Sequence, residues 1–135
     1  MTDHVSPQVR SAIMRSVHTK GSAPEMAVRK VLHRLGYRYR LHDSRLPGSP
    51  DLVFPKRRKA IFVHGCFWHG HDCKWGRPPK SNIRYWVDKI EKNKKRDSLV
   101  CRQLFQTGWA YEIVWQCQLK KMEEVIERIV EFLEE

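Results

Sequence analysis

The stretch of the sequence that most constrains the fold is residues 64–73, which read His-Gly-Cys-Phe-Trp-His-Gly-His-Asp-Cys. From Gly65 to Lys80 the chain is rich in glycine, proline, cysteine and histidine and contains few aliphatic side chains. Such a loop cannot be held by an apolar core of its own, so something else must order it. Its cysteines and histidines point to a metal ion.

Three of the metal-type residues, Cys66, His71 and Cys73, lie within eight residues of one another. Thiolates and imidazoles are the usual ligands of zinc, and a structural zinc site holds four of them in a tetrahedron. The alternative is a set of buried free thiols and surface histidines, which a loop without a core disfavours. We therefore expect a structural zinc ion that needs a fourth ligand from elsewhere.

Two cysteines outside the loop are candidates for that fourth ligand. Cys117 directly follows an expected strand, whereas Cys101 is expected inside a helix. A strand end can meet a loop at another strand end, so we favour Cys117, with His69 as a competitor. A closed set of four ligands argues for a structural rather than a catalytic zinc.

Hydrophobic periodicity predicts the order helix, three strands, helix, strand, helix. The helices are expected at about 22–36, 81–108 and 120–133, and the strands at about 37–41, 51–54, 60–64 and 109–115. A three-strand meander followed by a helical crossover gives a mixed four-stranded sheet flanked by helices. We therefore expect an α/β fold in one domain, residues 1–135, with residues 1–20 as a basic N-terminal arm.

The charge balance indicates a polyanionic partner. The chain has 26 Lys and Arg against 15 Asp and Glu, a formal charge of +11. Nucleic acid is the usual partner of so basic a protein, because phosphate contacts release counterions. The alternative is simply a soluble basic surface. No apolar run approaches the roughly 18 residues of a membrane span, and the first residues do not resemble a secretory signal. We expect a cytoplasmic protein without membrane contact.

A second cluster of reactive side chains is expected at the rim of the sheet. Asp51 opens one strand and His64 closes the next. Asp51 can bind magnesium, which polarises a phosphate and activates water, while His64 and His69 can transfer protons near neutral pH. The alternatives are that Asp51 caps a turn and that His64 is a structural strand-end residue.

Two further features allow two interpretations each. Glu25 most simply completes a capping box at the start of the first helix. The pair Phe67-Trp68 is either part of a core or an exposed aromatic wedge that enters between bases.

The motifs together resemble those of the very short patch repair (Vsr) mismatch endonucleases. The resemblance rests first on the run from Phe62 to His69, followed by His71 and Cys73. It continues in the segments 46–51, 85–90 and 108–117 and in the basic Met14-Arg15 pair, and it spans roughly residues 8–117.

The resemblance implies a restriction-endonuclease-like fold and nicking of one strand 5′ to the T of a T:G mismatch left by deamination of 5-methylcytosine. It implies catalytic magnesium, a separate structural zinc and double-stranded DNA with a mismatch as the substrate. We also expect a monomer that contacts mismatch-repair proteins. The alternatives are a nuclease of the same fold with broader mismatch or sequence choice, and a zinc-stapled DNA-binding module without catalysis. Asp51 and His69 discriminate, because a binding module needs neither.

The resemblance also implies roles for individual residues. Asp51 and the backbone carbonyl of Val63 bind magnesium, His69 is the catalytic base, and His64 and Glu25 assist. The implied zinc ligands are Cys66, His71, Cys73 and Cys117. The implied DNA-binding residues are Met14, Arg15, Phe67 and Trp68, of which Met14, Phe67 and Trp68 insert into the duplex.

Two departures from related nucleases concern the strand that ends at His64. Val63 stands where the best-known member of the family has threonine, a change that a backbone carbonyl ligand tolerates and a hydroxyl ligand does not. The acidic-x-Lys pair of the wider nuclease superfamily is absent, since the strand reads Val63-His64-Gly65 without lysine. This fits a Vsr-type site in which histidines replace that lysine.

Overall fold

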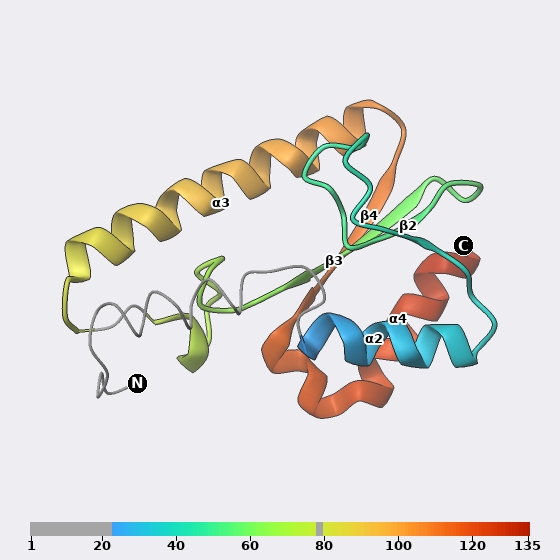
Figure 1. Cartoon of the computed structure of the whole chain (residues 1–135), viewed down its shortest axis with the longest axis horizontal. Coiled ribbons are helices and arrows are strands. Elements are labelled where there is room, and N and C mark those ends of the chain that lie inside the picture. Colours follow the sequence, from blue (N-terminus) through green and yellow to red (C-terminus); the bar gives the residue numbers. More distant parts are fainter. Residues whose placement is uncertain (1–22, 78–79) are drawn as a thin grey trace.

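The computed structural model describes residues 23–77 and 80–135 (Figure 1). Its helices and strands are α2 (Ala23–Arg34), β1 (Arg40–Leu41), β2 (Leu52–Phe54), β3 (Lys59–His64), η1 (Lys74–Gly76), α3 (Ile83–Gln106), β4 (Ala110–Trp115), η2 (Gln116–Lys121) and α4 (Met122–Glu134). The expected N-terminal arm, with Met14 and Arg15, and Ser22, the first residue of the expected first helix, lie outside the described residues.

The four strands form one mixed sheet in the order β1-β2-β3-β4. The pairs β1–β2 and β2–β3 are antiparallel, and β3 pairs with β4 in parallel after the crossover through α3. The register places His64 opposite Trp115, so β3 and β4 end level with each other. The predicted α/β class and the mixed four-stranded sheet are confirmed.

The first strand is shorter than the expected 37–41, because two tyrosines leave the sheet edge. The rings of Tyr37 and Tyr39 pack edge-to-face on Phe54, with centroids 6.4 and 6.0 Å away. The hydroxyl of Tyr39 also donates to the Arg29 carbonyl of α2, 2.9 Å away. Only Arg40 and Leu41 remain to pair with β2.

One face of the sheet is covered by α2 and α4, which lie side by side in Figure 1. The core between the helices and the sheet consists of aliphatic side chains and two phenylalanines: Val28, Leu32, Leu52, Phe54, Ile61, Val114, Val125, Ile129, Phe132 and Leu133. Each large aliphatic side chain buried there stabilises the fold by about 1.5–3 kcal/mol. This core anchors β2 and β3, whose ends carry the candidate site.

The long helix α3 lies on the other side of the sheet and extends well beyond it (Figure 1). Its C-terminal half contacts β4 and buries Leu104 fully. Its N-terminal half covers the Cys- and His-rich loop, where Trp86 packs on Trp68 and Asn93 donates to the Trp68 carbonyl at 2.9 Å. The helix therefore supplies the apolar surface on which the loop packs. None of the helices in the described ranges is both long and apolar enough to cross a membrane.

Candidate active site and metal centre

The structure brings Cys66, His71, Cys73 and Cys117 together, with one donor atom of each lying within 4.8 Å of the others. The strand register explains why. Cys66 and Cys117 each follow the last residue of their strand by two positions, and those strands, β3 and β4, end level. The two cysteines from distant parts of the chain therefore meet at one rim of the sheet.

Three sulfurs and one imidazole nitrogen form the donor set that zinc prefers. The Cys117 N–H donates to the Cys66 sulfur at 3.4 Å, and the Cys117 sulfur lies 3.5 Å from His71 Nδ1. Burial raises the pKa of the Cys66 thiol to about 12. A divalent cation would stabilise the thiolates that this environment disfavours, so the four side chains fit a zinc ion.

The two competing ligands belong elsewhere. Cys101 lies on α3 beside Tyr111, whose hydroxyl group is its hydrogen-bond partner. His69 belongs to a different group, with His64 and Asp97.

The loop that carries three of the four candidate ligands closes tightly on itself. A Cβ atom added at Gly76 would lie 2.0 Å from the carbonyl oxygen of His71. Only glycine permits this approach of one backbone segment to another. On the other side, the ring of His71 stacks on Trp115 at a centroid distance of 4.2 Å. The position of the candidate ligand His71 is therefore set by backbone packing as well as by its neighbours.

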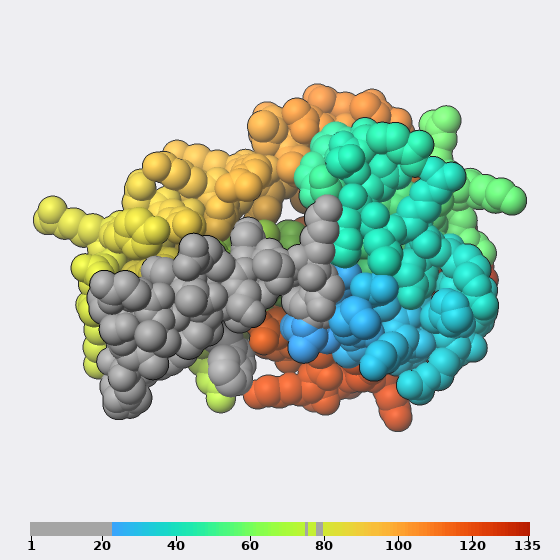
Figure 2. Space-filling model, viewed as in Figure 1, coloured from blue at the N-terminus to red at the C-terminus, as the bar shows by residue number. Residues whose placement is uncertain are grey.

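A cleft of about 280 Å³ lies next to this cluster. Residues of α2, the 42–50 loop, the end of β3 and α3 line it. Figure 2 shows the 42–50 loop on the same face as α2 and below the C-terminal half of α3. Gly48 allows the loop to approach α3, because a Cβ atom there would lie 2.5 Å from Val100 Cγ1. The functional groups in the cleft are Glu25, Asp51, His64, His69, Arg96 and Asp97.

Asp51 lies at the start of β2 with its carboxylate turned toward β3. Its Oδ2 accepts a hydrogen bond from the Val63 backbone N–H at 2.7 Å. Burial raises the pKa of Asp51 to about 6, and the nearby Glu25 carboxylate raises it further, whereas the Val63 N–H lowers it. Ionised Asp51 is thus held at a disadvantage that a bound cation would remove.

Glu25 contributes a second carboxylate to the same place. Although it lies in the first turn of α2, it is only 2% exposed and lines the cleft. Its Oε1 lies 2.8 Å from His42 Nε2, and its Oε2 accepts from Arg29 at 3.3 Å. Donor atoms of Glu25, His42 and Asp51 lie within 4.8 Å of one another. Two carboxylates at this spacing fit a hard divalent cation such as magnesium.

The two histidines expected to transfer protons differ in character. Their rings stack almost parallel, with centroids 3.7 Å apart. Burial lowers the pKa of His64 to about 3, and the charge of His69 lowers it further, against an opposing effect of Asp97. His64 is therefore neutral at physiological pH, which disfavours it as a general acid.

His69 is oriented by a carboxylate that the sequence analysis did not single out. Its Nδ1 lies 2.5 Å from Asp97 Oδ2 of α3. This contact occupies Nδ1 and leaves Nε2 as the ring nitrogen available for proton transfer. The pair resembles the histidine–carboxylate arrangement in which the acid orients the base.

Three residues of the cleft region were missed from the sequence: His42, Arg96 and Asp97. His42 lies in a turn-rich loop, where nothing in the local pattern distinguishes it. Asp97 lies in the charged middle of α3, which suggests a solvated helix face. A signal was present, because Trp86, Ile90, Asn93 and Asp97 follow one another at spacings of three or four, the spacing of one helix face.

The aromatic pair of the loop is less exposed than one of its two interpretations requires. Trp68 is 7% exposed, and its ring packs edge-to-face on Trp86 with centroids 6.3 Å apart. Phe67 is half-buried, with its ring centroid 5.4 Å from that of Trp86. Trp68 therefore packs in a small aromatic cluster in the structure, because α3 supplies an apolar partner that the loop lacks.

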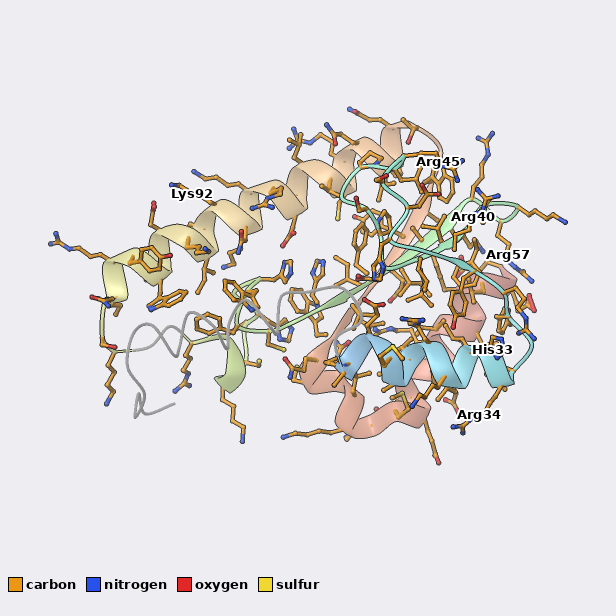
Figure 3. All side chains as sticks on the ribbon, in the orientation of Figure 1. His33, Arg34, Arg40, Arg45, Arg57 and Lys92 are labelled. Carbon is orange, nitrogen blue, oxygen red and sulfur yellow. The ribbon has the colours of Figure 1, made fainter. Side chains whose placement is uncertain are left out.

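Basic side chains project from several parts of the surface. Figure 3 shows Arg40 and Arg45, before β2, and Lys92 of α3 pointing outward, and all three are exposed. Arg45 and Lys92 pair with the neighbouring Asp43 and Asp88 at 2.9 and 3.2 Å. Arg57 binds the end of α4 through the Leu133 carbonyl at 2.8 Å and the Glu134 carboxylate at 3.0 Å. The exposed cations suit a polyanionic partner.

Known proteins resemble this chain over most of its length. A family model described as "DNA mismatch endonuclease Vsr" matches residues 2–75. The type II nicking enzyme V.XorIIP of Xanthomonas oryzae is 52% identical over 122 residues, which cover 90% of each chain. The type II nicking enzyme V.NmeAIP of Neisseria meningitidis is 44% identical over 120 residues, which cover 89% of this chain and 86% of the relative. The DNA mismatch endonuclease Vsr of Escherichia coli is 38% identical over 136 residues, which cover 100% of this chain and 87% of the relative.

Proposed function

The chain belongs to the Vsr family of DNA mismatch endonucleases, and on that premise we propose that it nicks one strand of double-stranded DNA at T:G mismatches, 5′ to the T, in very short patch repair. The observation that carries the proposal is the cleft in which Asp51 and the His69–Asp97 pair lie beside the Cys- and His-rich loop. A DNA-binding module without catalysis has no need of this cleft.

The catalytic roles follow from the chemistry of the side chains. Asp51 and Glu25, with the Val63 backbone carbonyl, would hold magnesium. When bound, that ion polarises the phosphate and lowers the pKa of a water molecule. His69 removes the proton of the attacking water through Nε2, and Asp97 holds its ring in the required orientation. Neutral His64 stacks on His69 and restricts its rotation.

Arg96 completes the electrostatics of the cleft. It is the one lysine or arginine among the described residues that line it. Its guanidinium donates to the Asn93 side chain at 3.0 Å, which holds it beside the His69–Asp97 pair. A phosphodiester that enters the cleft meets this cation, which offsets the repulsion from Glu25, Asp51 and Asp97.

The metal cluster and the aromatic residues would present the loop to DNA. Cys66, His71, Cys73 and Cys117 would hold a structural zinc that fixes the loop on a restriction-endonuclease-like fold. Phe67, with Met14 and Arg15 of the arm, would contact the mismatch, and Trp68 would do so after its ring leaves its packing on Trp86. A mismatched step is cheaper to unstack than a paired one, so an aromatic wedge selects for it.

One active site suffices for a nick, so we propose that the protein acts as a monomer in the cytoplasm. Contact with mismatch-repair proteins remains part of the proposal.

The decisive experiment is a nicking assay on a panel of duplexes that carry each mismatch in varied flanking sequences, with and without magnesium. We expect one-strand cleavage at T:G that requires magnesium, and Asp51→Ala should bind the duplex without cutting it. Cleavage of several mismatches would favour the same-fold nuclease with broader choice. Binding without cleavage by the wild type would favour the DNA-binding module.

A further inference from the structure

His42 lies between the two carboxylates of the cleft. Its Nε2 is 2.8 Å from Glu25 Oε1 and 3.7 Å from Asp51 Oδ1. The side chains of all three are largely buried, with exposures of 13% for His42, 3% for Glu25 and 22% for Asp51. The hydrogen bond between Nε2 and Glu25 Oε1 occupies this ring nitrogen. That nitrogen is therefore engaged with a carboxylate and is not free to bind a cation.

The main chain at His42 holds the imidazole in this position. Its φ is +47°, in the left-handed region that non-glycine residues adopt uncommonly, although asparagine, aspartate and histidine do so more often than others. Its N–H donates to the Asp51 carbonyl at 3.2 Å and so continues the β1–β2 pairing by one residue. Strained backbone of this kind persists where the surroundings require it, and it gathers at functional sites. The backbone of Asp51 and the side chain of Glu25 are thus both tied to one residue.

Two carboxylates that face one cation repel each other before it arrives. Glu25 lies on α2 and Asp51 immediately precedes β2, and their carboxyl groups lie close enough to each other for a side-chain hydrogen bond. The His42 imidazole contacts Glu25, and the His42 backbone N–H donates to the Asp51 carbonyl. This one residue therefore fixes the distance between the two carboxylates. Without it, Glu25 retains its contact with Arg29, which draws the carboxylate along the helix.

We propose that His42 is a positioning residue, which orients Glu25 relative to Asp51 and thereby sets the affinity of the cleft for its divalent cation. The inference rests on the proposed function, because it assigns a residue to the same cation site. In this role His42 acts through Glu25, which its Nε2 contacts at 2.8 Å.

The test compares two variants that differ in reach. In His42→Gln the amide nitrogen stands near the position of Nε2 and can still donate to Glu25, whereas in His42→Asn the side chain is too short. Asparagine accepts the left-handed backbone well, so His42→Asn does not add strain. Arg58→Asn is the matched control, because Arg58 has a similar φ of +54° in the β2–β3 turn and an exposed side chain.

Two quantities are measured for each protein: the magnesium concentration at half-maximal nicking, and the rise in melting temperature that magnesium produces without DNA. We expect His42→Asn to need at least tenfold more magnesium and to lose most of the thermal shift. His42→Gln should stay within about threefold of the wild type, and Arg58→Asn should match it. The maximal rate at saturating magnesium should change little.

The outcomes distinguish a failure of the proposed function from a failure of the role given to His42. A wild type without magnesium-dependent nicking or thermal shift overturns the proposed function itself. A responsive wild type whose His42→Asn variant has the same magnesium midpoint overturns only the role of His42. Equal, large losses in His42→Asn and His42→Gln would show that the imidazole itself is a ligand, which also overturns the positioning role. A lower melting temperature without metal but an unchanged midpoint would show a merely structural residue.

Discussion

Replacing Asp51 with asparagine should stabilise the metal-free protein while it abolishes nicking. Asp51 is buried beside Glu25, and its pKa is raised from 3.8 to about 6. Asparagine keeps an oxygen that can accept from the Val63 N–H, now 2.7 Å from Asp51 Oδ2. Its amide group can donate to Glu25, so the substitution removes the buried charge without leaving a neighbour unpaired.

The sign and size of the effect follow from proton linkage. Between pH 3.8 and about 6 the folded protein holds a proton on Asp51 that the unfolded chain has lost, so stability falls as the pH rises through this window. Each pH unit of pKa difference corresponds to about 1.4 kcal/mol, so ionised Asp51 costs about 3 kcal/mol above pH 6. We expect asparagine to recover about 1–3 kcal/mol of this at pH 8. In a chain of this length that is a rise in melting temperature of roughly 3–10 °C.

The assay is thermal unfolding of wild type and Asp51→Asn at pH 8 and pH 5. The buffer contains no magnesium and no strong chelator, so that the candidate zinc cluster is left undisturbed. At pH 5 the wild-type carboxyl is largely protonated when folded, so the advantage of the variant should shrink by about half. Magnesium should raise the melting temperature of the wild type at pH 8 and leave that of the variant unchanged.

The control is Asp43→Asn, two residues after β1. Arg45 holds the pKa of the Asp43 carboxyl at about 2 through a side-chain hydrogen bond, so this charge is favourable in the folded protein. Its removal should give no gain at either pH. The reasoning would be refuted if Asp51→Asn melted at or below the wild-type temperature at pH 8, or if its advantage did not depend on pH.

Four further predictions concern the two clusters and the loop between them. His69→Ala should lower the nicking rate at least a hundredfold, because no other described group in the cleft is placed to act as the base. An unchanged nicking rate at saturating magnesium would contradict this prediction. Asp97→Asn should lower the rate about 10- to 100-fold with little change in DNA affinity, measured by single-turnover kinetics and a binding assay, because it loosens the orientation of His69. Cys117→Ala should lose its zinc, measured by metal analysis, and its melting temperature should fall by several degrees, whereas Cys101→Ala should keep the zinc content and the melting temperature of the wild type. Equal zinc contents in the two variants would show that the fourth ligand is wrongly chosen. Gly76→Ala should also lower zinc content and stability, because its Cβ would lie 2.0 Å from the His71 carbonyl oxygen, whereas Gly65→Ala meets its nearest side-chain atom at an ordinary 3.7 Å and should retain zinc.

The element order could be predicted from the sequence because it follows from local periodicity. Apolar side chains at helical spacing in α2 and α4 and the near-continuous apolar run of β3 identify these elements without knowledge of their partners. The length of β1 could not be predicted, because it depends on whether Tyr37 and Tyr39 pair with β2 or pack on Phe54. Tertiary packing overrides local preference at such a sheet edge.

The residues of the candidate metal cluster could also be predicted from the sequence. Cysteine and histidine are rare and chemically distinct, and the end of a strand is a place where loops meet, so Cys117 could be preferred to Cys101. The roles of Asp97 and His42 could not be predicted, for the opposite reason. Aspartate on a charged helix and histidine in a loop are common, and only their contacts with His69 and Glu25 distinguish them.

By itself the sequence determined which donor types the chain carries and where strands and helices alternate, because both are properties of short segments. The tertiary structure alone decided how similar groups in the loop and its surroundings diverge in behaviour. Burial keeps His64 neutral, with a pKa of about 3, while Asp97 orients the neighbouring His69. The pKa of Asp51 rises to about 6 mainly because the fold removes water from it, and further because α2 places Glu25 against it. Desolvation and electrostatic interaction depend on distances between residues remote in the chain, and those distances exist only once the sheet and its helices have assembled.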